Sequence, residues 1–106
     1  TDVIRMQGAD RYATAAKVAE ECVGLGWGDW SAIGLATGMN FPDALSGGAA
    51  LGTRGGVLLL TEAGSLSQAA YDAISGNASP ATMALVLGGS AAVNDAVIQT
   101  VRGLLP

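Results

Sequence analysis

Blocks of purely apolar residues alternate with mixed apolar and polar blocks along the chain, and the two kinds differ in length and period. Residues 31–37, 56–61 and 83–87 are apolar almost throughout, which is typical of strands that are buried on both faces of a sheet. Residues 3–6, with the sequence Val-Ile-Arg-Met, form a fourth, β-prone run before a glycine. The pattern therefore predicts four strands.

The longer blocks between these runs have the period of helices. In residues 11–25, small or apolar side chains recur every three or four positions and define one buried face: Ala15, Val18, Ala19, Cys22 and Val23. The last block repeats this spacing at Val97, Ile98, Val101 and Leu104. Residues 44–52 are rich in glycine, so a helix there is expected to form only if it packs very closely on its neighbour.

Residues with capping chemistry mark where these helices begin. Asp10 and Asn94 stand where a side chain is expected to accept from the first free amides of a helix. Pro42 and Asp43 fit the first turn of a second helix, because proline lacks an N–H there and a carboxylate suits the helix dipole. Residues 65–68, Ser-Leu-Ser-Gln, read as a capping box whose first serine is the cap of a third helix.

Four strands that alternate with four helices predict an α/β fold. Strands that are apolar throughout and joined by helical crossovers imply a parallel sheet covered on both faces. We therefore expect a three-layer α/β/α sandwich with a four-stranded, mostly parallel sheet, similar to flavodoxin-like or Rossmann-like folds. The length of 106 residues fits a single domain that spans residues 1–106.

Ligands of open parallel sheets gather beyond the carboxyl ends of the strands, so that edge is the expected site. The polar residues there are the candidate ligand-binding residues: Arg5, Arg11, Asn40, Asp43, Ser46, Thr61 and Ser90. Four of them also have a structural interpretation. Arg11 and Asp43 are expected to pair with each other, Asn40 to cap its helix, and Thr61 to satisfy loop amides.

The composition argues against several classes of enzyme. A Gly88-Gly89-Ser90 turn after a strand resembles a nucleophile elbow, but the chain has no histidine and therefore no Ser-His-Asp relay. The glycine loops fit neither a dinucleotide nor a Walker pattern, and no zinc or calcium ligand spacing occurs. We expect no catalysis, no metal and no cofactor.

Charge and hydropathy limit the partners. The net charge of −4 argues against nucleic acid and against an anionic membrane surface. No apolar run approaches the ~20 residues that a membrane span needs, so no membrane insertion is expected. Cys22 is the lone cysteine and is expected to be a small buried hydrophobe. The start at Thr1 indicates a piece of a longer precursor, which leaves export by a signal peptide open.

Four motifs, in order, resemble the cell-wall-binding repeat 2 family. Residues 5–15, with Arg5, Gly8 and an Asp-Arg-Tyr-Ala-Thr-Ala run, are similar to its opening motif and are the most specific of the four. Residues 38–46 resemble its second motif, 57–61 its third strand and 87–93 its closing motif. Val57 departs from the family pattern, since several members have a proline there.

The resemblance implies a function. Such modules usually occur in threes, pack around a pseudo-threefold axis, and hold exported proteins non-covalently on an anionic secondary polymer of a Gram-positive cell wall. It implies an extracellular, wall-bound protein without catalysis. It also implies sister modules as partners, with a homotrimer as a hypothesis for this single copy. Two alternatives stay open: a small-molecule or phosphate-binding α/β domain, and a domain that binds only its sister modules.

Overall fold

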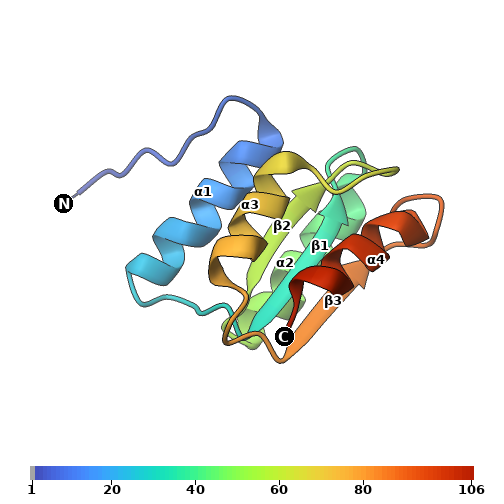
Figure 1. The fold of residues 1–106 in the computed structure, drawn as a ribbon. Helices are drawn as coiled ribbons and strands as arrows, with labels where there is room; N and C mark the ends of the chain where they lie inside the picture. The colour runs from blue at the N-terminus through green and yellow to red at the C-terminus, as the bar shows by residue number, and fades with distance from the viewer. Residues whose placement is uncertain (1) are drawn as a thin grey trace.

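A three-stranded parallel sheet lies at the centre of the molecule (Figure 1). The computed structural model describes residues 2–106, apart from the side chain of Phe41. The strands are β1 (Ala32–Thr37), β2 (Val57–Thr61) and β3 (Met83–Leu87), in the order β2-β1-β3. All six residues of β1 are buried, since it is the central strand, and its Leu35 lies opposite Leu59 of β2 and Val86 of β3.

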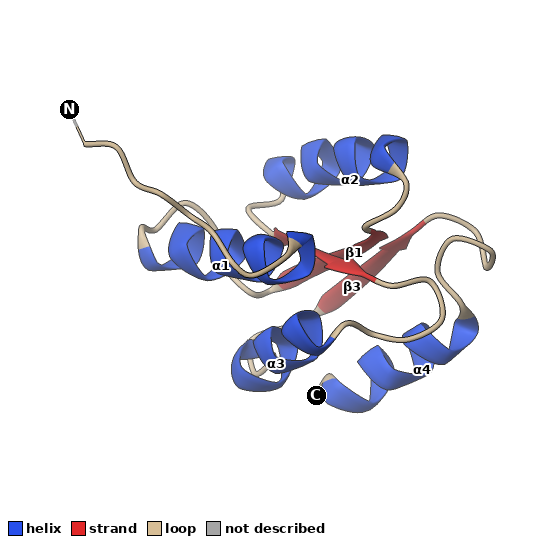
Figure 2. Cartoon of the chain, turned by 90° about the horizontal axis from the view of Figure 1, so that it is seen from above, coloured by secondary structure: helices blue, strands red, loops and turns tan. Residues whose placement is uncertain are grey.

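Helices lie on both sides of the sheet (Figure 2). They are α1 (Arg11–Gly24), α2 (Phe41–Thr53), α3 (Gln68–Asn77) and α4 (Asp95–Leu104). Helix α2 covers one side, whereas α3 and α4 lie on the other. Helix α1 runs along β2 and packs against α3. The prediction of an α/β fold with four helices is confirmed.

The prediction of a fourth strand is wrong. Residues 3–6 form no strand, and the chain before α1 extends away from the body of the molecule (Figure 1). The side chain of Val3 is 95% exposed. High β-propensity describes how well a residue fits a pleated, half-buried surface, and within this one chain the segment has no neighbouring strand to supply that surface. The sheet therefore has three strands in residues 2–106.

Two of the predicted caps are confirmed, and two are corrected. The Asp10 carboxylate accepts from the amide of Ala13 at 2.8 Å, and Asn94 accepts from its own helix in the same way. Helix α3 is capped by Ser67 and not by the first serine of the capping box. Asn40 stands at the N-cap position of α2 but makes no side-chain cap bond, and its amide nitrogen donates to the carboxylate of Asp43.

Close packing explains how the glycine-rich helix α2 persists. A Cβ atom built on Gly47 would lie 2.0 Å from a methyl carbon of Leu87, and one on Gly34 would lie 1.9 Å from a methyl carbon of Leu51. The bare glycine surfaces therefore let α2 approach β1 and β3 within the reach of these leucines. The expectation of close packing at this helix is confirmed.

The predicted buried face of α1 is confirmed only in part. Ala19 is buried as predicted and Val23 packs against the core, but Ala16 is also buried and Val18 is 39% exposed. Cys22 is half-buried, where a small buried side chain was predicted. The helix is turned toward α3 and the core, which leaves part of its apolar stripe beside the outer edge of β2.

Candidate functional site

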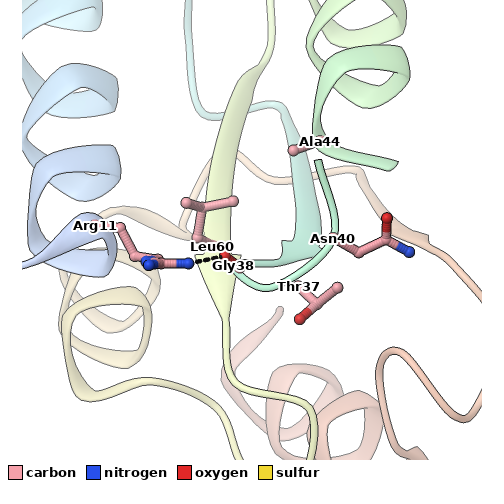
Figure 3. Close-up of a pocket in the computed structure, with 6 residues that line it drawn as sticks. All are labelled: Arg11, Thr37, Gly38, Asn40, Ala44 and Leu60. Atoms are coloured by element: carbon pink, nitrogen blue, oxygen red, sulfur yellow. Dashed lines mark hydrogen bonds between the residues drawn. The ribbon is translucent and has the colours of Figure 1, made fainter. Parts of the chain in front are cut away.

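A pocket of about 280 Å³ opens at the carboxyl edge of the sheet, between the first turns of α1 and α2 (Figure 3). Six residues from four segments line it: Arg11, Thr37, Gly38, Asn40, Ala44 and Leu60. The sequence predicted this edge, because the loops that follow parallel strands meet there. The pocket combines an apolar floor with a few polar groups, as small binding sites do.

Arg11 is the cationic group of this pocket. It is the first residue of α1, and its guanidinium Nη1 donates to the carbonyl oxygen of Gly38 and lies 3.6 Å from the sulfur of Met39 (Figure 3). A guanidinium has five N–H donors, so most of the donors of Arg11 remain available to a ligand. The bond to Gly38 fixes the direction of the side chain.

The expected ion pair between Arg11 and Asp43 is absent. Within residues 2–106 the ion pair is the one between Lys17 and Glu21, at 2.7 Å on the exposed side of α1. Asp43 instead accepts from the amide of Asn40 at 3.1 Å. Arg11 donates instead to the carbonyl oxygen of Gly38, which lies between the two helices (Figure 3).

Asn40 and Asp43 lie on the side of the pocket that faces β3. The side chain of Asn40 points away from Arg11 (Figure 3). The carboxylate of Asp43 lies next to the turn after β3, since a Cβ atom on Gly88 would be 2.8 Å from its oxygen. Negative charge therefore lies near the Gly88-Gly89-Ser90 turn, and positive charge lies at Arg11.

The structure separates the remaining predicted residues from the pocket. Arg5 is exposed in the segment before α1, Ser46 is exposed on α2, and Ser90 is exposed after β3. Thr61 is fully buried, and its hydroxyl donates to the carbonyl oxygens of Glu62 and Ser65. Thr61 thus satisfies loop carbonyls, where amides were predicted, and none of these residues lines the pocket.

Sequence reasoning missed four lining residues: Thr37, Gly38, Ala44 and Leu60. The hydroxyl of Thr37 accepts from the amide of Met39 at 3.2 Å and shapes the turn after β1. A signal for Thr37 and Gly38 was present, because they end an apolar strand at the expected edge. Ala44 and Leu60 carry no polar group, so no sequence signal distinguishes them from core residues.

The clear pKa shifts lie outside the pocket. A hydrogen bond from the hydroxyl of Ser31, aided by the amide of the same residue, lowers the pKa of Asp29 at the opposite edge of the sheet. The hydrogen bond and charge of Glu21 raise the pKa of Lys17. In residues 2–106, no group of three or more potential metal ligands is found, and no helix is long and apolar enough to cross a membrane.

Comparison with known protein families shows which family the chain belongs to. The model of a family described as cell wall binding domain 2 (CWB2) matches residues 5–98. The chain belongs to the CWB2 family. The CWB2 match includes every residue that lines the pocket, and the resemblance drawn from the four motifs is confirmed. No curated protein and no solved structure gives a significant match.

Membership in CWB2 gives a function in coarse terms. It indicates a cell wall binding domain, and therefore a place at the cell surface. The match covers one module, without a second copy in the chain. Of the residues that line the pocket at the carboxyl edge, Arg11 is the one with a positive charge.

Proposed function

We propose that this CWB2 module holds an exported surface protein non-covalently on an anionic secondary polymer of a Gram-positive cell wall, without catalysing a reaction. The observation that carries the proposal is the positive charge of Arg11, which lies at the pocket and is unpaired in the described part of the chain. Its guanidinium lies at the pocket, keeps free donors, and has no carboxylate within 4 Å in residues 2–106. A cation without a partner at a pocket favours an anionic ligand.

Helix geometry supports the same polarity. Helices α1 and α2 both begin at this edge, where the helix dipole favours anions. The Asp10 carboxylate already caps α1, so α2, which has no side-chain cap, is the helix whose first amides stay available. The net charge of −4 opposes long-range attraction of a polyanion, so binding rests on local charge. A module of this kind gains affinity from repetition along a polymer, since linked sites raise the effective concentration of each other.

Phosphate binding at the Gly88-Gly89-Ser90 turn is less well supported. The carboxylate of Asp43 lies beside Gly88, and a second negative charge there costs free energy through like-charge repulsion. Gly89 and Ser90 are exposed and form no part of the pocket. The polymer therefore remains the proposed ligand, and Arg11 its main contact.

The test measures binding to an anionic polymer released from purified Gram-positive walls, with stripped peptidoglycan as the comparison surface. Arg11→Ala is expected to weaken binding by about tenfold, because a hydrogen bond to a charged group contributes about 1.5 kcal/mol. Binding of the unchanged protein is expected to weaken as salt rises, and that of the variant to depend less on salt.

Arg102→Ala is the matched control. Arg102 lies in the last turn of α4, is exposed, and lines neither the pocket of Arg11 nor the surface beside β2, and its substitution removes the same charge. It is expected to bind as the unchanged protein does. Equal loss in both variants would show that net charge alone drives binding, and an unfolded Arg11→Ala protein by circular dichroism would assign Arg11 to the fold.

Association of sister modules is the second part of the proposal. The family resemblance implies modules in threes, and a single copy leaves any such contact surface exposed, which supports a homotrimer. The exposed apolar residues include Val18 on α1 and Leu45 on α2, at 39% and 72% exposure. These two residues belong to different surfaces, because Val18 lines an apolar groove beside β2 and Leu45 does not.

A further inference from the structure

An apolar groove of about 350 Å³ runs beside β2, between α1 and α2. It is lined by carbon atoms of both helices and of the strand, including Ala15, Val18, Cys22, Ala44, Leu58 and Leu60. We call it the β2 groove. Ala44 and Leu60 also line the pocket of Arg11, so the groove ends at that pocket.

The strand beside this groove has an unpaired edge. β2 pairs only with β1, since the order of the described sheet is β2-β1-β3. The carbonyl of Thr61 faces β1, where it accepts from the amide of Gly38. The N–H and C=O groups of successive residues point to opposite sides of a parallel strand, so those of Leu58 and Leu60 point to the outer edge of β2. The hydroxyl of Ser67 donates to the carbonyl of Leu60, so this acceptor at the carboxyl end of the edge already has a partner.

The chain also carries an unpaired strand former. Residues 3–6 make no backbone hydrogen bond in the described structure, and Val3 and Ile4 are 95% and 52% exposed. The amide of Gly8 donates to the hydroxyl of Thr14 at 3.0 Å, which fixes where the segment leaves α1. From that point the segment runs away from its own sheet (Figure 1).

We propose that the β2 groove receives residues 3–6 of a second copy as a strand parallel to β2. The lengths agree, because four residues span about 13 Å, the same as Val57 to Leu60. An exposed strand edge is a template for another chain, and exchange of a terminal segment is an economical route to association. Every copy then donates one segment and accepts one.

Charge selects the parallel direction. Asp2 precedes the segment and Arg5 lies near its end, whereas Arg54 precedes β2 and Glu62 follows it. Arg54 and Glu62 are both exposed. A parallel strand places Asp2 toward Arg54 and Arg5 toward Glu62, and an antiparallel strand places like charges together. Opposite charges at both ends therefore favour the parallel arrangement.

This inference rests on the proposed association of sister modules and names its surface, but it does not depend on polymer binding. Cys22 makes it testable, because it lines the groove and is the only cysteine. Cys22 lies near the end of α1, and α1 begins at the carboxyl edge, so Cys22 is close to the start of β2. A parallel strand brings residue 3 of the second copy to the same end.

The experiment oxidises Val3→Cys protein and separates it on a non-reducing gel. A reducible species of two or more chains is expected, linked through Cys22 by mass spectrometry. Val3→Cys with Cys22→Ser is the control and is expected to remain unlinked. Met6→Cys lies at the other end of a parallel strand and is expected to cross-link several-fold less. A disulfide within one chain would overturn the proposal, as would preferential linkage through Met6→Cys.

The oligomeric state of surface variants, measured by light scattering, tests whether this surface makes the contact. The unchanged protein is expected to associate, Ile4→Glu to be monomeric, and Leu45→Glu on exposed α2 to associate as before. If Ile4→Glu still associates, the contact lies on another surface and the strand proposal is wrong. If the unchanged protein is a monomer, the association itself is wrong. Polymer binding by the monomeric variant, measured in parallel, tests the wall-binding proposal on its own.

Discussion

Gly88 shows how one residue joins two parts of the candidate site. It follows β3 with a φ of 110°, a conformation that side chains with a Cβ atom rarely adopt. A Cβ atom there would also lie 2.8 Å from the carboxylate of Asp43 and 3.0 Å from the methyl group of Ala92. Glycine at this position therefore permits both the positive φ and the close approach of Asp43 on α2.

Gly88→Ala is expected to lower the free energy of unfolding by roughly 1–3 kcal/mol, from backbone strain and displacement of Asp43. Gly89→Ala is the matched control, because Gly89 has no positive φ and no neighbour within 4 Å of a Cβ atom. It is expected to change stability by less than about 0.5 kcal/mol. Urea unfolding measures both, and equal losses would contradict the special role of Gly88.

The sequence predicted a turn at the Gly88-Gly89 pair but could not tell the two residues apart. Glycine pairs mark turns in general, whereas the sign of φ depends on how the chain must leave the sheet. The same limit applies to Arg11. Its place at a helix start was predicted, but its choice of the Gly38 carbonyl over Asp43 depended on which group lay closer in three dimensions.

At the scale of elements, Ser67 ties α3 to the sheet. Its hydroxyl accepts from the amide of Ala70 at 3.3 Å and donates to the carbonyl of Leu60 at 2.9 Å. The side chain is buried, at 6% exposure, so water cannot easily replace these bonds. One residue therefore sets both where the helix begins and how it sits against β2.

Ser67→Ala is expected to cost about 1–2 kcal/mol of unfolding free energy, through the lost cap and the bare carbonyl of Leu60. Ser65→Ala tests the alternative cap from the sequence pattern and is expected to be nearly neutral, because the exposed Ser65 takes part through its backbone carbonyl. Thermal unfolding compares the two. A larger loss at Ser65 would restore the capping box as the start of the helix.

At the scale of the whole molecule, the body and the N-terminal segment behave as separate parts. The core cluster of buried residues is drawn from α1, α3, α4, β1, β2 and the connecting loops, and it includes no residue before Ala16. The segment extends from one corner of this body (Figure 1). We therefore expect its removal to leave the fold intact and to abolish only the proposed association of copies.

Deletion of residues 1–6 is expected to retain the far-ultraviolet circular dichroism spectrum of the folded protein. The unfolding midpoint of the full chain is expected to rise with protein concentration, because association stabilises the folded state by mass action. The midpoint of the shortened chain is expected to be independent of concentration. Loss of folded signal on deletion would show that the segment stabilises its own copy.

Local sequence determined the elements of this protein. Apolar runs and helical periods gave β1, β2, β3 and all four helices to within a few residues, because these patterns reflect burial along one element. The four motifs and their order also predicted the CWB2 family, which the match over residues 5–98 confirms. The carboxyl edge of the sheet followed from parallel topology alone.

Only the tertiary structure decided which groups meet. Residues 3–6 have the propensity of a strand, yet pairing needs a neighbouring edge, and their own chain carries them away from one. Arg11 and Asp43 have opposite charges, yet nearer partners at Gly38 and Asn40 take them. Propensity and charge belong to single residues, whereas pairing depends on distance, and distance exists only once the chain is folded.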